Sequence, residues 1–407
     1  MEWKEVRLGD VCEIYGRIGF RGYTTNDLVD TPKEGAISLS PKNIINGELN
    51  LDQCTYIKWD KYYESPEIMI NPNEIIITKT GSSVGRTTFV RRVDHPMTLN
   101  PQLVVLKNIS ENAEFLSYYI KSALFQSVLK SIVVGSAIPT LSQKNLANLK
   151  INVPKEVDYQ RRIASILSSL DRKIELNNKI NADLEEMAQA IFKNWFVDFE
   201  PFKDGKFVDS ELGMIPEGWK VGTLTEIASY MNGLAMQKYP PENIEDSLPV
   251  LKIKELGQGF CGTDSDRCSC NIKDECKIHN GDVIFSWSGT LLVDVWCGGD
   301  CGLNQHLFKV TSNDYPKWFY YYWTKHHLQE FIHIAKDKAV TMGHIKRGHL
   351  EEALVAIPDN DSMEKAHKLF EPILSKMISL RLENSRLSLL RDTLLPRLMS
   401  GELEVPE

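Results

Sequence analysis

The sequence has no hydrophobic run long enough to cross a membrane. Its longest apolar stretches, around residues 75–77 and 291–293, are far shorter than the roughly 20 residues that a spanning helix needs. The first residues also lack the basic stretch followed by an apolar one that is typical of an export signal, so we expect a cytoplasmic protein. Glycine and proline, with 25 and 18 residues among 407, are too few for a low-complexity chain. The 42% apolar content predicts a folded protein of two or three domains.

An excess of positive charge is also missing, because the formal net charge is −8. This excludes a uniformly basic surface of the kind that coats nucleic acid. The acidity lies mainly in the later part of the chain, since residues 1–156 hold 18 Lys and Arg against 17 Asp and Glu. A nearly neutral domain can still present a basic face, so DNA binding stays open.

Cysteine is rare outside one segment, and six of the eight cysteines lie between Cys261 and Cys301. Their spacing lacks the paired C-x2-C knuckles of most structural zinc sites. We therefore expect free thiols and no metal site, although spacing alone leaves zinc open. A disulfide framework is not expected in a chain without an export signal.

The sequence contains an internal repeat. Five segments recur in the same order, between 203 and 216 residues further on, as expected for a duplicated unit with insertions in its loops. The matching segments are Trp3-Lys4 with Trp219-Lys220, residues 73–81 with 281–289, residues 99–103 with 303–307, residues 115–119 with 318–322, and Pro154 with Pro358. Each copy combines short β-type runs with a later helical stretch, which predicts two globular α+β domains.

After each globular copy, a helical stretch carries an apolar seam with a period of seven residues. Met187 supports the first seam, and Pro396 interrupts the second. The seam positions are Ile163, Leu170, Asn177, Leu184 and Ile191 in the first stretch, and Ile373, Leu380, Leu387 and Leu394, with Asn384 beside them, in the second.

Forty helical residues span about 60 Å, which is much longer than a helix needs to cover one small domain. We predict that the two helices pair as an antiparallel coiled coil, with Asn177 and Asn384 setting the register. The alternative is that each helix packs on its own globular domain. The predicted order is a first domain at residues 1–156, a first long helix at 157–200, a linker and second domain at 201–358, and a second long helix and tail at 359–407.

Several segments resemble the DNA sequence-specificity (S) subunit of Type I restriction-modification systems, and the resemblance covers nearly the whole chain. The order of two globular units and two helices is similar. The segments that carry the resemblance are IFKNWFVDFEPF at residues 191–202, LGMIPEGW at 212–219, GLNQHLF at 302–308 and LLPRLMSGEL at 394–403.

The resemblance implies a non-catalytic subunit with two target recognition domains, each of which reads one half of a bipartite, asymmetric site in double-stranded DNA. It also implies that the long helices set the spacing and dock two modification subunits, with a restriction subunit as an optional further partner. S-adenosylmethionine is then expected in the modification subunits and no cofactor in this chain. The alternative is a duplicated protein-interaction scaffold that does not bind DNA.

DNA contacts require Arg and Lys for phosphate and guanine, Asn and Gln for adenine, and small hydroxyl side chains where the backbone approaches phosphate. Turns and motifs that supply such groups occur in both copies. The candidates are Lys42, Lys79, Ser82, Ser83, Arg86 and Lys144 in the first copy, and Ser286, Trp287, Ser288, Asn304, Gln305, His306, His344, Lys346 and Arg347 in the second.

No catalytic motif is complete. The segment at residues 81–87 has three residues between its glycines where a nucleotide-binding loop needs four, and Arg86 takes the place of the lysine. The segment at residues 100–103 lacks the second proline and the aromatic residue of an adenine methyltransferase motif. We therefore predict no catalytic residues in this chain.

Overall fold

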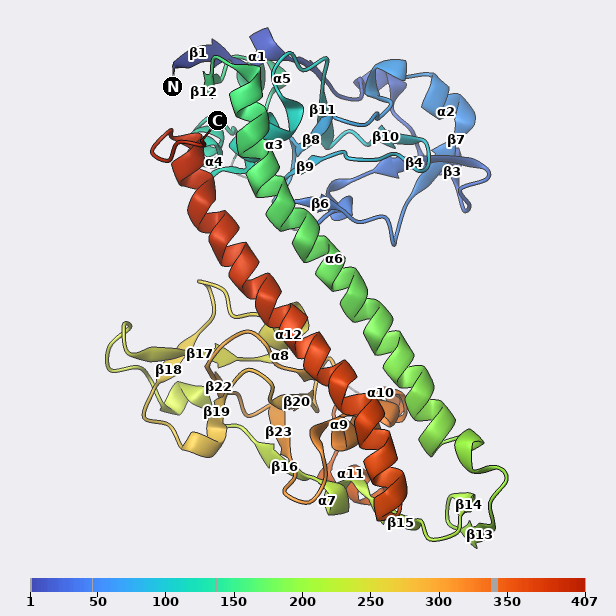
Figure 1. Cartoon of the computed structure of the whole chain (residues 1–407). Helices are drawn as coiled ribbons and strands as arrows, with labels where there is room; N and C mark the ends of the chain where they lie inside the picture. The colour runs from blue at the N-terminus through green and yellow to red at the C-terminus, as the bar shows by residue number, and fades with distance from the viewer. Residues whose placement is uncertain (1, 46, 136–137, 338–342, 407) are drawn as a thin grey trace. The chain divides into compact units, whose positions relative to one another are not determined.

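The structure, a computed structural model, describes residues 2–45, 47–135, 138–337 and 343–406. It comprises two compact units (Figure 1). Unit 1 combines Met1–Arg172 with Ser388–Glu407, and unit 2 consists of Lys173–Leu387. Each unit contains one globular head and a part of each long helix. Within the described residues, no helical segment combines the length and the hydrophobicity of a membrane span.

The head of unit 1 contains two four-stranded sheets and a two-stranded one. Its strands are β1 (Trp3–Arg7), β2 (Glu13–Tyr15), β3 (Leu28–Val29), β4 (Gly35–Leu39), β7 (Tyr56–Lys58), β8 (Ile75–Thr78), β9 (Thr87–Phe89), β10 (Met97–Leu99), β11 (Leu103–Lys107) and β12 (Lys150–Pro154). The sheets have the orders β2-β11-β8-β9, β10-β4-β7-β3 and β1-β12. The short hairpin β5 (Ile44–Ile45) and β6 (Glu48–Leu49) is separate from them.

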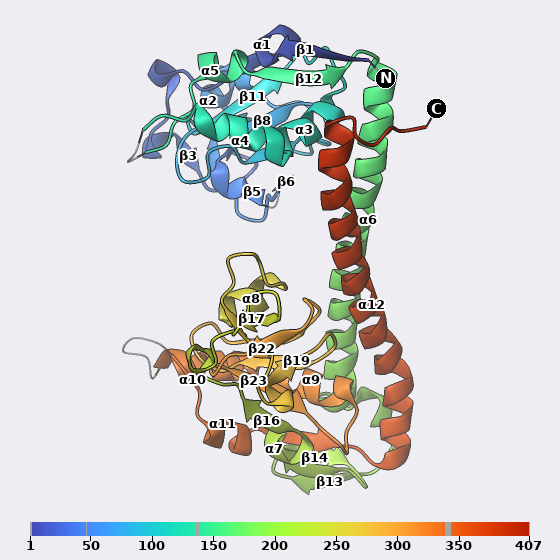
Figure 2. The same cartoon turned by 90° about the vertical axis from the view of Figure 1, so that its left-hand side faces the viewer.

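Helices cover one face of the β2-β11-β8-β9 sheet. The helices of this head are α1 (Leu8–Val11), α2 (Trp59–Tyr63), α3 (Ala113–Lys121), α4 (Ala123–Ser131) and α5 (Gln143–Ala147). Figure 2 shows α3 and α4 beside β8 and β11, and their apolar side chains share one buried cluster with those strands. The side chain of Asn112 begins α3 by accepting a hydrogen bond from the Phe115 N–H at 2.8 Å.

The head of unit 2 repeats this arrangement. Its strands are β15 (Lys220–Thr223), β16 (Ser229–Asn232), β17 (Ser247–Leu251), β18 (Arg267–Ser269), β19 (Lys277–Ile278), β20 (Val283–Ser286), β21 (Leu292–Val295), β22 (Cys301–Leu303), β23 (Leu307–Thr311) and β24 (Leu354–Ile357). Its helices are α7 (Leu224–Ile227), α8 (Ile253–Gln258), α9 (Lys317–His326), α10 (Leu328–Asp337) and α11 (Arg347–Glu352). A further hairpin, β13 (Phe207–Ser210) and β14 (Gly213–Pro216), precedes this head.

The strand order confirms the duplication that the sequence predicts. The sheet β16-β23-β20-β21 corresponds to β2-β11-β8-β9, and the pair β15-β24 corresponds to β1-β12. In both heads the second sheet contains one parallel pair, β4 with β10 and β17 with β22. The central strands β8 and β20 are buried at every position, as expected for short continuous apolar runs.

Two 40-residue helices, α6 (Val157–Phe196) and α12 (Asn360–Met399), run through both units. In unit 1 they lie side by side, and Ile163 and Leu167 of α6 share a buried cluster with Leu398 and Met399 of α12. The first helix ends at Phe196, whereas the predicted segment extends to residue 200.

In unit 2 the helix pair contains a buried amide. Asn177 is fully buried, and its Nδ2 donates to Asn384 Oδ1 and to Glu383 Oε2, both at 2.8 Å. Asn384 in turn donates to Asn178 Oδ1 at 2.8 Å. From Asp171 through Asn177 to Phe192, the partners on α12 run backwards, from Arg391 through Asn384 to Phe370. The predicted antiparallel coiled coil and its polar register contact are therefore confirmed.

The other seam positions are buried to different degrees. Ile163 and Leu380 are buried, whereas Leu170, Leu184, Ile191, Ile373, Leu387 and Leu394 are half-buried. Two details of the sequence analysis were wrong. Met187 is 45% exposed, and Ala188 takes its place in the seam; α12 also continues through Pro396 to Met399.

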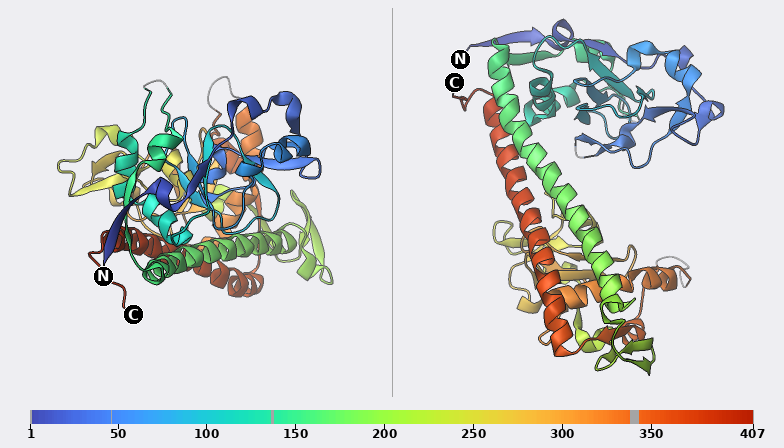
Figure 3. Two further views of the ribbon diagram at one scale, coloured as in Figure 1. Left: turned by 90° about the horizontal axis from the view of Figure 1, so that it is seen from above. Right: turned by 45° about the vertical axis from the view of Figure 1, so that its right-hand side comes forward.

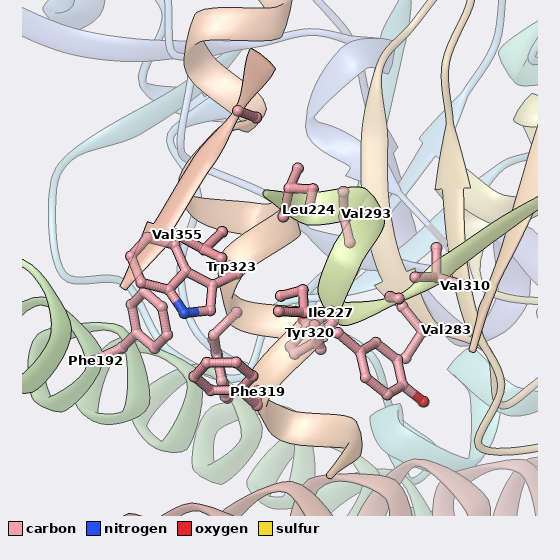
Figure 4. Close-up of a cluster of buried hydrophobic side chains, with 14 of the residues drawn as sticks. Phe192, Leu224, Ile227, Val283, Val293, Val310, Phe319, Tyr320, Trp323 and Val355 are labelled. Atoms are coloured by element: carbon pink, nitrogen blue, oxygen red, sulfur yellow. The ribbon is translucent and has the colours of Figure 1, made fainter. Parts of the chain in front are cut away.

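The long helices also pack on the heads, so the alternative arrangement holds together with helix pairing. In unit 2 the ring of Phe192 on α6 meets Trp323 of α9 edge to face, with centroids 5.1 Å apart (Figure 4). Phe196 lies 5.8 Å from Trp318, which stacks on Phe370 of α12 at 4.6 Å and 12°. All of these aromatic side chains are buried: Phe192 and Trp323 are 3% exposed, and the other three are at most 1% exposed.

The two ends of the chain meet in unit 1, as the right-hand view of Figure 3 shows. The Val405 N–H donates to the hydroxyl of Tyr159, near the start of α6, at 3.0 Å. Gly401 lies against the ring of Trp3 and has a φ of 76°, so a side chain at this position would be strained and would meet the indole. Leu403 and Val405 of the C-terminal tail are partly buried and pack against the core of unit 1.

We predict that Phe370→Ala lowers the free energy of unfolding by about 3–5 kcal/mol, because it removes a buried ring from the aromatic cluster. Urea denaturation followed by tryptophan fluorescence measures the change. The control is Leu389→Ala on the same helix, where the side chain is 70% exposed and the expected change is below about 0.5 kcal/mol. Equal losses in the two variants would contradict the prediction.

Candidate nucleic-acid interface

Four candidate residues of unit 1, Lys79, Ser82, Ser83 and Arg86, lie in the turn between β8 and β9, residues 79–86, which we call turn 1. Lys42 lies apart in a short 3-10 turn at Pro41–Asn43, and Lys144 lies in α5. Two hydrogen bonds close the hairpin, from the Thr78 N–H to Arg86 O at 2.8 Å and from the Gly85 N–H to Thr78 O at 2.9 Å. Gly81 and Gly85 have φ values of 104° and 90°. Glycine is required there because residues with a Cβ rarely adopt this backbone conformation.

A neighbouring loop, residues 139–141, holds turn 1 in place through main-chain bonds. The Gly81 N–H donates to Pro139 O at 3.0 Å, and the Leu141 N–H donates to Lys79 O at 2.8 Å. On its other side, the Lys79 N–H donates to Gln102 O at 2.8 Å. Turn 1 is therefore fixed by its backbone, and its side chains remain available for other contacts.

Unit 2 builds the same element at residues 287–291, which we call turn 2. The Gly289 N–H donates to Gly343 O at 2.9 Å, and the Ile345 N–H donates to Trp287 O at 3.1 Å. A β-bridge between Ser288 and His344 corresponds to the bridge between Thr80 and Thr140 in unit 1. The sequence match between residues 73–81 and 281–289 thus reflects one shared turn-and-loop structure.

The candidate side chains of unit 1 are mostly exposed. Lys42, Ser82, Arg86 and Lys144 are exposed, and Lys79 and Ser83 are half-buried. Among the described residues, Lys42, Lys79, Arg86 and Lys144 form no ion pair with a carboxylate. Burial lowers the pKa of Lys79, because the surrounding protein solvates its ammonium group less well than water does. Nearby anionic groups such as DNA phosphates would stabilise the charged form of this lysine.

In unit 2 the structure brings most of the candidate residues into contact. The Ser288 hydroxyl lies 3.1 Å from His306 Nδ1, and the Asn304 side chain accepts a bond from the His306 N–H at 3.3 Å. The Trp287 ring lies 6.0 Å from that of His306 and 6.3 Å from that of His344. Gln305 and His306 are exposed beside this cluster.

Three further candidates of unit 2 lie apart from these contacts or point inward. Ser286 is fully buried, and its hydroxyl donates to Thr290 O at 2.8 Å, so it supports turn 2 from within. Lys346 and Arg347 are exposed at the start of α11, directly after the loop that holds turn 2.

The sequence analysis missed Gln102, which is exposed beside turn 1. A Cβ atom on Gly81 would lie 3.8 Å from Gln102 Nε2, so this amide borders the turn. The internal repeat could have identified it, because the match of residues 99–103 with 303–307 aligns Gln102 with His306. Both residues follow an Asn whose N–H bonds to the strand below, Asn100 to Leu39 O and Asn304 to Leu251 O.

The cysteines offer no metal site in the described part of the chain. All eight are free thiols. No three His, Cys, Asp or Glu side chains among the residues that the structure describes lie close enough to hold a metal ion.

A family model, the Type I restriction modification DNA specificity domain, matches residues 1–186 and 216–386. The chain belongs to this family. The two matches of the specificity domain cover both heads and much of both long helices. Membership of the specificity-domain family makes this chain a DNA-recognition protein without catalytic activity of its own, and favours this role over that of a general protein-interaction scaffold.

Relatives of the specificity-domain family match the whole length of the chain. It is 29% identical to the Type I restriction enzyme MjaIX specificity subunit of Methanocaldococcus jannaschii, over 100% of this chain and 94% of the relative. It is 22% identical to the HindI specificity subunit of Haemophilus influenzae, over 99% and 100%. The crystal structure of the S subunit from M. genitalium shares the fold, with a TM-score of 0.53, 16% identity and coverage of 98% and 96%.

We predict that Gly289→Val destabilises turn 2, because Gly289 has a φ of 66° and a β-branched residue is strained there by about 1–3 kcal/mol. Urea denaturation measures the loss. The control is Gly257→Ala in α8, where no left-handed backbone is needed and the added methyl group meets open space. This control should leave stability unchanged or raise it, and a Gly289→Val protein as stable as the control would refute the prediction.

Proposed function

We propose that each head reads one half of a bipartite target in double-stranded DNA, and that the α6–α12 pair sets the number of unread base pairs between the halves. One observation carries this proposal: the two heads build the same turn-and-loop element from corresponding main-chain bonds but equip it with different side chains. Turn 1 presents Lys79 and Arg86, whereas turn 2 is bordered by Gln305 and His306. Different side chains on the same backbone favour two unlike half-sites over a palindrome.

The side chains suggest how each half-site is contacted. The exposed guanidinium of Arg86 suits a guanine edge in the major groove, and the half-buried ammonium of Lys79 suits a phosphate. In unit 2 the exposed amide of Gln305 suits adenine. The side-chain Oδ1 of Asn304 already accepts the His306 N–H, so Asn304 serves first to shape the turn that presents Gln305 and His306.

We further propose that the long helices dock two modification subunits, which bind S-adenosylmethionine and methylate adenine, and that a restriction subunit can join this complex in the cytoplasm. Apolar side chains on the outer faces of the helices support docking, since Leu176 is 52% exposed and Leu389 is 70% exposed. Further exposed apolar residues on the helices are Met187, Leu369 and Leu390.

We predict that Arg86→Ala weakens binding of the first half-site by about 1–3 kcal/mol if Arg86 contacts a guanine, with no change in the bases preferred at the second half-site. The measurement is a titration of duplex DNA with the complex of this chain and its modification subunits at several salt concentrations. Loss that is uniform across sequences, with a shallower salt dependence, would assign Arg86 to phosphate.

The control for Arg86→Ala is Arg92→Ala in the same head, where the side chain is 80% exposed and forms an exposed ion pair with Asp94 outside turn 1. This variant should bind like the unmodified chain. Unchanged binding of Arg86→Ala in all salt conditions would remove Arg86 from the interface.

We predict that removing residues 172–178 from α6 and 383–389 from α12 together shortens the spacer of the target by about three base pairs. Seven residues correspond to about 10 Å of helix, and base pairs are about 3.4 Å apart. The deletion keeps the heptad seam in phase and removes both members of the Asn177–Asn384 contact. Sequencing of methylated sites in cells that express the variant with its modification subunits reports the half-sites and the spacer. An unchanged spacer would refute the role of the helices as a ruler.

A further inference from the structure

Arg381 of α12 joins this helix directly to the β20–β21 hairpin of unit 2, which carries turn 2. Arg381 Nη1 and Nη2 donate to Asp294 Oδ1 and Oδ2 at 2.9 and 2.6 Å, and Nη1 also donates to Val295 O at 2.7 Å. The side chains of Arg381 and Asp294 are 33% and 20% exposed. Two parallel bonds from a planar guanidinium to one carboxylate restrict the orientation of both groups.

The surroundings of Arg381 favour its charged form. Burial alone would lower the pKa of Arg381, but the hydrogen bonds and the charge of Asp294 outweigh burial and raise it. The guanidinium of Arg381 therefore stays charged across the physiological pH range.

Asp294 lies at the end of the hairpin opposite to turn 2. In the β20–β21 pairing, Asp294 is opposite Ile284, while Ser286 and Leu292 form the last pair before the turn. The strands of this hairpin are short, mostly buried and paired at all four positions, so a contact that fixes the base of the hairpin also restricts its tip. Arg381 thus connects α12 to the element that carries Trp287 and Ser288.

Unit 1 uses a different connection. Arg391 of α12 donates to Asp171 Oδ1 of α6 at 2.8 Å, and the hydroxyl of Tyr118 on α3 donates to Asp171 Oδ2 at 2.5 Å. This network ties α3 to the helix pair. The β8–β9 hairpin is joined to α6 indirectly, because Arg91, two residues after β9, pairs with Glu114 of α3 at 2.5 Å and Glu114 lies 3.7 Å from Arg172 of α6. Among the residues that the structure describes, the hairpin of unit 2 is therefore the one that α12 holds through a direct bidentate contact.

We propose that Arg381 and Asp294 are positioning residues that fix the orientation of turn 2 relative to α12, and so restrict the DNA spacer length that the protein accepts. This inference rests on the proposed bipartite DNA function. One added base pair moves a half-site by about 3.4 Å and rotates it by about 35°. A hairpin held at its base resists that change, whereas a hairpin without the contact adapts to it.

The test uses the complex of this chain with its modification subunits and three DNA duplexes that carry the cognate half-sites with the cognate spacer, one base pair fewer or one more. The measured quantity is the ratio of Kd for the altered spacers to Kd for the cognate spacer. We expect Arg381→Met and Asp294→Asn to lower this ratio about fivefold or more, with the preferred half-site bases unchanged. Arg381→Lys, which supplies a point charge without the planar fork, should give an intermediate ratio.

Two further variants separate positioning from stability. The double variant Arg381→Met with Asp294→Leu replaces the ion pair by apolar groups, which commonly preserves folding, and should still have lost spacer selectivity at an unchanged Tm. Arg386→Met, at an exposed position of the same helix, should behave like the unmodified chain.

The outcomes distinguish the inference from the function on which it rests. A double variant that is folded and keeps the spacer selectivity of the unmodified chain would overturn the positioning role alone. An unmodified chain that binds the duplexes with no preference for any spacer would overturn the bipartite function and, with it, this inference.

Discussion

A buried amide between the two long helices fixes the register in which they pair. Asn177 is fully enclosed, and its Nδ2 has two acceptors on α12, Glu383 and Asn384. Sliding one helix along the other would leave a buried polar group without partners, at a cost of about 1–3 kcal/mol. In this register Phe192 meets Phe370 in unit 2, and Asp171 meets Arg391 in unit 1. In each pair, the residue on α6 is nearly as far from Asn177 as its partner on α12 is from Asn384, and the two lie on opposite sides along the sequence. The packing of each head on the helices depends on this alignment.

Much of this architecture could be predicted from the sequence because its signals are periodic. An apolar residue at every seventh position indicates a helix pair whichever residues face it, and five ordered matches indicate a duplicated domain. The errors arose where geometry departs from the ideal repeat. A helix of 3.6 residues per turn drifts relative to a seven-residue repeat, and Ala188 faces the seam where Met187 was expected. Pro396 lies near the end of α12, and the helix continues for one more turn.

The candidate interface was only partly predictable. The sequence located both turns through their glycines and through the repeat. It could not predict the loops that hold them, because the bonds from Gly81 to Pro139 and from Gly289 to Gly343 join backbone atoms and leave no residue signature. It also could not predict what each hydroxyl contacts: Ser286 and Ser288 are both buried, but Ser286 bonds within the turn and Ser288 contacts His306. The repeat aligns Gln102 with the candidate His306, so a comparison of the two copies beyond their strands would have identified Gln102.

Main-chain hydrogen bonds hold the turn-and-loop element of each head, and this affects how the DNA target of such a protein can change. Neither turn relies on the exposed side chains of Arg86 or Gln305 to hold its shape, so exchanges at these positions need not be compensated elsewhere in the head. New combinations of bases can then become targets through single surface substitutions, while glycines at the strained positions and the apolar strands beneath remain constant. The preference for DNA bases can therefore change while the fold of each head stays the same.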